Sequence, residues 1–502
     1  MNYSPVKICA YIFAVLLIML GLTYLSSSKI STDGKTQEGF YFNEIGLKYP
    51  TTNSFWNNTT LDAEKIKAID SIVGNIQHTV ISEEKENKED KIVFSDVKKV
   101  HDIRDIPDIT KIDTTKIERI QYPNNAHEFI SQLKQHLNSP VCRIIHYGDS
   151  QIEGDRISSY IRNRLQGIYG GFGPGFIPIV QVYNQISADV THSENWTRYA
   201  VFDPKQKRLE HKKYGVYTTL SRFTPNVVAQ DSLDIESLPL TKAIINISPS
   251  KRSYNRLKNF TKIGLHYGNA QSPTSIKVYN NGVLIANDNL NMGVDYQRYG
   301  INLETTPSNL KIELESKISP DFYGLTLDGT QGVLIDNVAM RGSSGTVFAG
   351  LDNQNFTKMF AQLQPKILIF QYGGNTVPYL KDSTGVDNYA RYVKNHINWV
   401  RNKKPDASVI FIGPSDMTTS ENGQFTTYKL LPYLNETLQK TCLENNIAYW
   451  SMFDAMGGEN SMEHWVDQKL ASTDYTHFSP SGTKIIAEMF FLALYLDLIE
   501  KK

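Results

Sequence analysis

A serine, a histidine and an aspartate occur in two short motifs whose types and order would allow nucleophilic catalysis. Gly-Asp-Ser at 148–150 follows a strand-like apolar run, and Asp-Tyr-Thr-His at 474–477 precedes the last helix-like segment. A serine hydroxyl needs an imidazole to accept its proton, and a carboxylate on the other ring nitrogen holds the imidazole in the right tautomer. Ser150 is therefore the candidate nucleophile, His477 the candidate base and Asp474 the candidate orienting residue.

Two turns rich in small residues lie between these motifs. The turn at 337–345 follows the apolar run 332–335, and Gly-Gly-Asn at 373–375 follows the strand-like run 367–372. Acyl transfer passes through a tetrahedral intermediate whose negative oxygen needs preorganised hydrogen-bond donors. Backbone N–H groups at glycine turns and one Asn side chain meet that need.

With these blocks in this order, the chain resembles the SGNH/GDSL hydrolase family. The resemblance implies that the four residues of the family name are Ser150, Gly342, Asn375 and His477. It also implies an oxyanion hole made by the N–H groups of Ser150 and Gly342 and by the Asn375 side chain. The family's third block usually continues with aspartate after the asparagine. Thr376 stands there instead, so the usual support for Asn375 is in question, whereas its donor role is not.

The surrounding pattern predicts an α/β fold. Helical periodicity is expected at 125–133, 156–169, 388–401, 433–445 and 481–499, and buried strands at 142–147, 367–372, 408–412 and 448–450. The strand-turn-helix order places Ser150 where helix-end amides favour an anionic transition state. Together with the family resemblance, the pattern predicts a three-layer α/β/α, flavodoxin-like SGNH-hydrolase domain in two parts, 124–185 and 332–502.

Short alternating strands replace this pattern between the two parts. The clearest are 242–247, 262–267, 275–279 and 310–314. They predict a β-sandwich or jelly-roll domain, 186–331, inserted into the hydrolase. An insertion at this place resembles the carbohydrate-module-like domain of periplasmic peptidoglycan O-acetylesterases. Trp196, Tyr199 and Tyr217 are either sugar-stacking or core residues, and the glycine-rich run 170–176 either shapes an acyl pocket or forms a tight turn.

The N-terminus indicates an exported protein. Residues 8–25 form an apolar stretch after Lys7, so 1–28 is expected to be a signal-anchor, or transmembrane, segment, with a cleaved signal peptide as the alternative. Residues 29–123, which include the charge-dense run 83–91, are expected to form a polar stalk or linker. We therefore expect a bacterial cell-envelope protein on the periplasmic side, anchored in the inner membrane by its N-terminal helix.

Composition narrows the possible functions. The formal net charge of the 502 residues is zero, which gives no argument for a nucleic-acid partner. No Cys/His cluster has metal-ligand spacing, and no cofactor is expected. His146 lies within a strand pattern and is expected to be packed. Cys142 and Cys442 are expected to be buried free thiols, with a disulfide between them as the alternative.

These observations predict a serine esterase that removes O-acetyl groups from a cell-envelope or other glycan through an acyl-serine intermediate. Its partner would be the acetylated glycan itself. One alternative is an O-acetyltransferase that modifies peptidoglycan or exopolysaccharide together with a membrane O-acyltransferase. A second alternative is a catalytically inactive glycan-binding envelope protein.

Overall fold

The computed structural model describes residues 4–30, 36–42, 45–52, 63–89, 106–225, 235–421 and 424–500. The chain divides into two compact units, which are described separately below. The small unit comprises Met1–Lys67 and Ser420–Gln424, and the large unit comprises Ala68–Thr419 and Phe425–Lys502.

The small unit contains an apolar helix and a three-stranded antiparallel sheet. They are α1 (Pro5–Leu25), β1 (Ser27–Ile30), β2 (Thr36–Phe42) and β3 (Ile45–Lys48). Within the described residues, α1 is the one helix long and apolar enough to cross a membrane, with a mean hydropathy of 2.4 over its most apolar window. It lies within the predicted anchor segment, 1–28. A signal sequence near the N-terminus would have the same length and apolar composition.

A five-stranded parallel sheet forms the centre of the large unit. In spatial order its strands are β16 (Gly332–Ala339), β4 (Val141–Gly148), β17 (Pro365–Gln371), β18 (Ser408–Ile412) and β21 (Ala448–Trp450). Numbered along the chain, this is the order 2-1-3-4-5 of flavodoxin-like sheets, which confirms the predicted fold class. Because β4 lies between β16 and β17, the residues that follow its carboxyl end lie beside those that follow these two strands.

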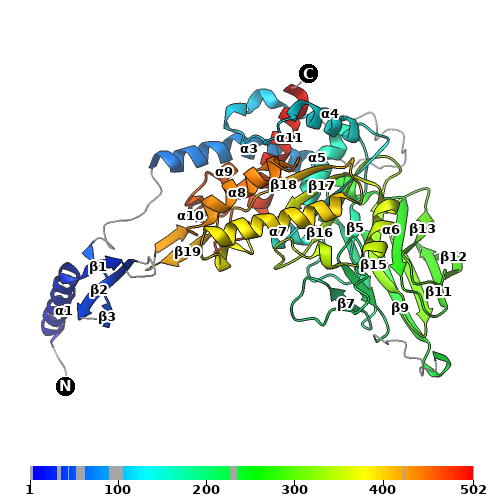
Figure 1. The fold of residues 1–502 in the computed structure, drawn as a ribbon, viewed down its shortest axis with the longest axis horizontal. Coiled ribbons are helices and arrows are strands. Elements are labelled where there is room, and N and C mark those ends of the chain that lie inside the picture. The colour runs from blue at the N-terminus through cyan, green and yellow to red at the C-terminus, as the bar shows by residue number, and fades with distance from the viewer. Residues whose placement is uncertain are drawn as a thin grey trace. The chain divides into compact units, whose positions relative to one another are not determined.

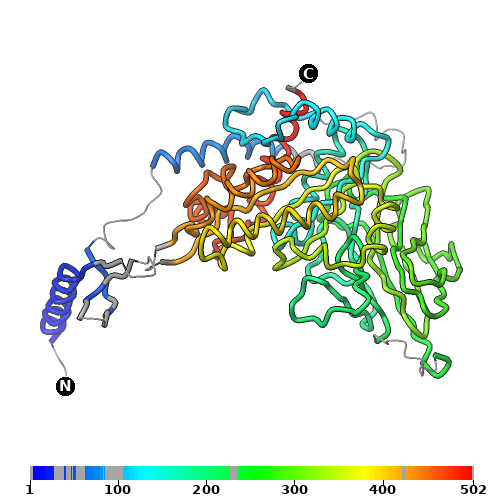
Figure 2. The backbone as a smooth tube through the Cα atoms, viewed as in Figure 1, coloured from blue at the N-terminus to red at the C-terminus, as the bar shows by residue number. Residues whose placement is uncertain are grey.

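Helices cover both faces of this sheet, as expected when a parallel sheet is buried on both sides. Those longer than ten residues are α4 (Ala126–Leu137), α5 (Ser158–Tyr169), α6 (Asn353–Leu363), α7 (Ser383–Arg401), α8 (Leu431–Leu443) and α11 (Pro480–Glu500). Two shorter ones are α9 (Met452–Ala455) and α10 (Ser461–Asp467). On one face α11 contacts α4 and α5, so the C-terminal helix lies beside the first helices of the domain (Figure 2). On the other face α6, α7 and α8 share one hydrophobic core with the sheet.

The inserted region forms two antiparallel sheets packed on a shared apolar core, as predicted for a β-sandwich (Figure 1). One sheet contains β13 (Gln297–Asn302), β10 (Lys262–Gly268), β15 (Asp321–Asp328), β8 (Thr219–Arg222) and β7 (Thr197–Ala200). The other contains β12 (Val283–Leu290), β11 (Thr274–Asn280), β14 (Leu310–Ser316), β9 (Thr241–Pro249) and β6 (Ala188–His192). Trp196 is buried here against Phe223 and Phe322, so it is a core residue.

The glycine-rich run 170–176 connects the two domains. It leads into β5 (Gly175–Ile177), which pairs with β15 of the sandwich. Gly175 has φ +74° and lies so close to β16 that a β-carbon there would overlap the carbonyl oxygen of Ile335. Only glycine combines that conformation with that approach, so the run fixes the sandwich against the hydrolase sheet.

The predicted stalk is only partly separate from the large unit. In α3 (Ala63–Glu89), Ile69 and Ile76 are buried, and Asp70 hydrogen-bonds His464 at 2.7 Å. Glu84, within the charge-dense run, forms an ion pair with Lys484, and residues 90–105 lie outside the described residues. The dense charges of this segment led to the prediction of a solvent-exposed stalk. However, α3 also has an apolar face, which is buried in the large unit.

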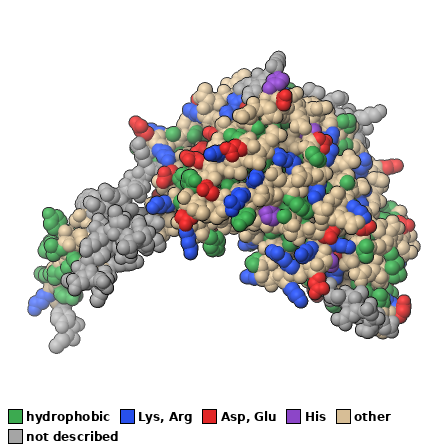
Figure 3. Space-filling view, in the orientation of Figure 1, with side chains coloured by type: hydrophobic (Ala, Val, Ile, Leu, Met, Phe, Trp, Pro, Cys, Tyr) green, Lys and Arg blue, Asp and Glu red, His purple; other side chains and the backbone are tan. Residues whose placement is uncertain are grey.

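The cysteines and the surface charges can also be compared with the expectations from the sequence. Cys142 and Cys442 are both buried free thiols, as predicted. On the face of the large unit seen in Figure 3, basic and acidic side chains are mixed. This distribution agrees with the formal net charge of zero.

Candidate active site

The serine turn is built at the carboxyl end of β4. The strand ends at Gly148, and the Asp149 side chain accepts the Gln151 N–H at 2.9 Å, which caps the 3-10 helix η4 (Ser150–Asp155). Ser150 is the first residue of that helix, and its Oγ lies 2.8 Å from His477 Nε2. This distance allows direct proton transfer between the two groups.

The histidine lies in a loop just before α11. Its Nδ1 is 2.8 Å from Asp474 Oδ2, and its backbone N–H donates to Asp474 Oδ1 at 3.0 Å. Partial burial tends to raise the pKa of Asp474, but the hydrogen bonds from His477 and from the Thr476 N–H outweigh it and hold that pKa below its ordinary value. Asp474 is therefore ionised and can fix the imidazole with Nε2 free to face Ser150.

The loop conformation depends on Tyr475, which lies between the aspartate and the histidine. Tyr475 has φ +52°, a left-handed conformation that costs a non-glycine residue about 1–3 kcal/mol. Its ring stacks on Phe425 with the ring centroids 4.0 Å apart, and its carbonyl accepts the Thr418 N–H at 3.3 Å. The hairpin of β19 (Thr418–Glu421) and β20 (Gln424–Thr427) thus supports the loop.

Asn375 lines the same small cavity as Ser150 and His477, whose volume is about 50 Å³. Its Nδ2 donates to Asp149 Oδ2 at 3.0 Å and to the Ser343 carbonyl at 3.1 Å. Support for Asn375 therefore comes from Asp149 and not from the position of Thr376. In this arrangement both amide hydrogens are engaged, so an oxyanion would have to share one of them.

Asp149 is the residue that motif reasoning overlooked. It is almost fully buried, and burial raises the pKa of its carboxyl to about 6 despite the hydrogen bonds from Gln151 and Asn375. It was visible in the sequence only as the middle residue of the serine motif. Its contacts show that it links the serine turn to the asparagine turn.

Gly342 lies apart from the small cavity. It is exposed, has φ +74° and sits in the turn after β16, next to Ser343, whose carbonyl contacts Asn375. It does not line the cavity that Ser150, Asn375 and His477 share. Hydrogen bonds thus join Ser150, His477 and Asp474. Gly342 is linked to the site only as the chain neighbour of Ser343, whose carbonyl accepts a hydrogen bond from Asn375.

Two further side chains brace the serine turn. Gln151 Nε2 donates to the Thr476 carbonyl at 2.7 Å, which joins this turn to the histidine loop. Arg156 Nη2 donates to the Ser150 carbonyl at 2.6 Å. No spacing rule in the sequence marks either residue, because both act through backbone carbonyls.

His146 is not a second base. Burial lowers its pKa to about 3, and its ring hydrogen-bonds Gln371 and Ser158. It is a packed histidine, as expected from its place in the strand. Within the described residues, no group of three or more His, Cys, Asp or Glu side chains could hold a metal ion.

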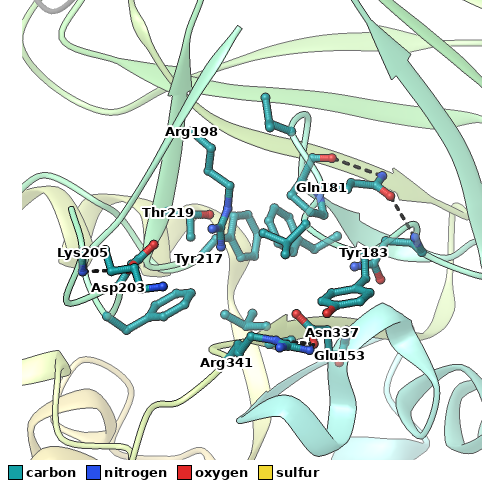
Figure 4. A pocket seen from close by; sticks show the side chains of 18 of the residues that line it. Glu153, Gln181, Tyr183, Arg198, Asp203, Lys205, Tyr217, Thr219, Asn337 and Arg341 are labelled. Atoms are coloured by element: carbon teal, nitrogen blue, oxygen red, sulfur yellow. Dashed lines mark hydrogen bonds and ion pairs between the residues drawn. The ribbon is translucent and has the colours of Figure 1, made fainter.

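A larger cavity of about 310 Å³ lies between the sandwich and the hydrolase sheet (Figure 4). Glu153 of η4 and Arg341, the residue before Gly342, line one wall, and Arg198 of β7 and Tyr217 line another. Tyr217 stacks on Phe176 with centroids 3.6 Å apart and is almost fully buried. The elements that carry Ser150 and Gly342 therefore also form part of this cavity.

Residues 320–485 match the model of the GDSL-like lipase/acylhydrolase family. This stretch is similar to that family, and the class of protein that the match and the fold support is the carboxylic ester hydrolases. The match contains Gly342, Asn375, Asp474 and His477. Ser150 precedes it because the sandwich separates the serine block from the others.

Solved structures add a likeness in fold. A structure titled "Peptidoglycan O-acetylesterase in action, 5 min" is 19% identical, has a TM-score of 0.56, and the alignment covers 74% of this chain and 97% of that one. A family two carbohydrate esterase from Clostridium thermocellum is 10% identical, with a TM-score of 0.22 and coverage of 51% and 93%. A GDSL-like lipase from Bacteroides ovatus is 10% identical, with a TM-score of 0.23 and coverage of 60% and 96%. No curated protein matches this chain.

Proposed function

We propose that this protein is a serine esterase that removes O-acetyl, or similarly small acyl, groups from a glycan of the cell envelope. The observation that carries the proposal is the hydrogen-bonded chain from Ser150 through His477 to Asp474, with 2.8 Å at each step. A serine, an imidazole and an ionised carboxylate in this order have the arrangement needed for acyl transfer.

In the proposed reaction Ser150 Oγ attacks the acyl carbonyl while His477 Nε2 takes the hydroxyl proton. The tetrahedral oxyanion is stabilised by the Ser150 N–H and by the Asn375 amide, which releases the Ser343 carbonyl. The family resemblance adds the N–H of Gly342, which precedes Ser343 in the same turn. His477 then protonates the departing sugar oxygen, which leaves an acyl-serine. Water reverses these steps: it gives a proton to His477, attacks the acyl carbonyl and restores Ser150 with release of the carboxylic acid.

Three observations support a glycan as substrate. The β-sandwich is inserted between the serine block and the rest of the site, the large cavity lies between sandwich and hydrolase, and the overall fold resembles that of a peptidoglycan O-acetylesterase. The helix α1 supports an envelope location, either as an anchor in the inner membrane with the enzyme on the periplasmic side or as a signal sequence. The small size of the cavity at Ser150 favours a short acyl group.

Acetate release tests the proposal. The full chain, purified in detergent, is assayed with 4-nitrophenyl acetate and with O-acetylated peptidoglycan, next to Ser150→Ala. We expect the variant to lose turnover by about 10³-fold or more. A fluorophosphonate probe should label Ser150 and no longer label the protein when His477 is replaced by alanine. Turnover that is unchanged in Ser150→Ala would refute the esterase.

Adding an unacetylated glycan acceptor separates hydrolysis from transfer, since the same acyl-serine would serve both. Acetyl groups that appear on the acceptor would favour an acetyltransferase working with a membrane O-acyltransferase. Glycan binding without any Ser150-dependent turnover would favour a binding protein.

A further inference from the structure

The large cavity contains a cation, the Arg198 guanidinium, that no carboxylate contacts directly. Arg198 extends from β7 into the cavity toward Tyr217 (Figure 4). Among the described residues, no acidic side chain lies within ion-pair distance of its guanidinium, and no side-chain hydrogen bond holds it. The ring of Phe202 lies beside it, with its centroid 5.5 Å from Arg198 Cζ. A guanidinium that is partly removed from water without a partner is free to bind an anion.

The other charged groups of the cavity are already engaged or lie at its rim. Glu153 forms an ion pair with Arg341 at 2.9 Å. Asp203 lies near Arg198 but accepts the Lys205 backbone N–H at 2.9 Å, and the Lys205 side chain is exposed. Three basic and two acidic side chains line the cavity, so one positive charge is in excess. This balance suits a ligand with one negative charge better than a doubly charged phosphate.

The rest of the lining suits a sugar ring. The stacked pair Phe176 and Tyr217, almost fully buried, forms the apolar base of the cavity. The rings with free surface are those of Phe202, which is half-buried, and of Tyr183, which is 48% exposed and stands at the rim with Arg341 4.5 Å above it. Aromatic rings offer apolar surface to the C–H faces of a sugar, and polar groups at a few points fix its orientation. The volume of about 310 Å³ is at the low end of the range of about 300–1,000 Å³ usual for small-molecule sites.

We propose that this cavity is a subsite for a carboxylate-bearing sugar of the acylated glycan, with Arg198 as the residue that binds the carboxylate. The proposal rests on the proposed esterase function, because Glu153 and Arg341 connect the cavity to the elements that carry Ser150 and Gly342. A sugar held there would orient an acyl group on the same or the adjoining residue toward Ser150. Substrate specificity would then depend on the negative charge of the glycan.

Binding is tested directly with the full-length Ser150→Ala variant in detergent, which separates binding from turnover. N-acetylmuramic acid and N-acetylglucosamine form a matched pair that differs in the lactyl carboxylate, and glucuronate and glucose form a second pair. We expect each acid to bind about 10- to 100-fold more tightly than its neutral partner, measured by calorimetry, and this preference to vanish in Arg198→Gln. Arg198→Lys should keep part of the preference for acids, because the positive charge remains while the bidentate hydrogen bonding of a guanidinium is lost.

Lys205→Gln is the matched control, since it removes a cation from the same cavity at its rim. It should leave the preference within about threefold, as exposed charges contribute little. Equal binding of acids and neutral sugars, or an unchanged preference in Arg198→Gln, would overturn the proposal. Tighter binding of glucose 6-phosphate than of glucuronate would overturn it in favour of a phosphate site.

The esterase is tested separately by 4-nitrophenyl acetate, which cannot fill the subsite. Lys205→Gln should hydrolyse it at the wild-type rate, whereas Arg198→Gln should lose about 10-fold or more in kcat/KM on acetylated acidic glycan compared with acetylated xylan. If the esterase proposal is wrong, the hydrolysis rate of every ester should be the same in the wild type and in Ser150→Ala.

Discussion

Replacing Asp149 with asparagine should slow ester hydrolysis without disturbing the nucleophile. The change keeps the size of the side chain but removes the charge that accepts hydrogen bonds from the Gln151 N–H at 2.9 Å and from Asn375 Nδ2 at 3.0 Å. An asparagine has one oxygen that can accept, so one of these two bonds is lost. A hydrogen bond to a buried charge contributes about 1.5–3 kcal/mol, and we expect kcat to fall about 10- to 100-fold.

A double-mutant cycle shows whether the effect passes through Asn375. Asp149→Asn, Asn375→Ala and the double variant are compared by kcat and KM for 4-nitrophenyl acetate. If Asp149 acts by holding the Asn375 amide, its replacement should cost less than about threefold once Asn375 is absent. A fully additive double variant, or a wild-type kcat in Asp149→Asn, would refute the reasoning.

The same residue predicts a pH dependence. Burial raises the pKa of Asp149 from 3.8 to about 6, so the carboxyl gains a proton as the pH falls through about 6 and then loses an acceptor for Asn375. We expect wild-type kcat to decline there, and the part of the decline that belongs to Asp149 to be missing from Asp149→Asn. For stability the sign is opposite. Because the pKa of Asp149 is higher in the folded state, the free energy of unfolding falls as the pH rises from 3.8 to about 6. Asp149→Asn should lack this part of the pH dependence.

Three further changes have expected outcomes. Asp474→Asn should lower kcat by about 10²- to 10⁴-fold with a normal melting temperature, since the imidazole loses the partner that fixes its tautomer; an unchanged kcat would contradict this. Phe425→Ala removes a ring stack worth about 0.5–1.5 kcal/mol from Tyr475, so kcat should fall about 2- to 12-fold with KM unchanged, and a change in KM alone would argue against a positioning role. Gly175→Ala should destabilise the fold by more than about 1 kcal/mol in urea denaturation, because its β-carbon would overlap Ile335, and wild-type stability would show that the close approach relaxes freely.

The hydrogen-bonded arrangement of Ser150, His477 and Asp474 and the central sheet were predictable because their determinants are local in sequence. Asp474 and His477 are three residues apart, and Ser150 directly follows an apolar strand, so each motif carries its own geometry. The flavodoxin-like class of the sheet came from the family resemblance, and in such sheets the residues after the carboxyl ends of neighbouring parallel strands meet at one edge.

The remaining features depend on contacts between distant segments. The engagement of Asn375 by Asp149 joins two turns 226 residues apart, and the walls around Arg198 come from the sandwich and from both parts of the hydrolase. The buried face of α3 had a sequence signal, the spacing of Ile69, Ile76 and Val80 along one side of a helix, but the charges around it dominated the composition. Phe176 and Tyr217 stack on each other from separate segments, which no spacing rule foresees.

The position of β4 has a consequence for how the chain is made. Both strands that flank it, β16 and β17, follow the inserted sandwich in sequence. During synthesis, β4 therefore emerges with both edges unpaired and stays so until the roughly 150 residues of the sandwich have followed, since elongation proceeds from the N-terminus. Unpaired apolar strands are prone to intermolecular association. The sandwich can complete most of its own pairing first, so the strand that leads to Ser150 gains its neighbours only after the sandwich has formed, and conditions that slow this step should trap aggregates in which the sandwich is already native.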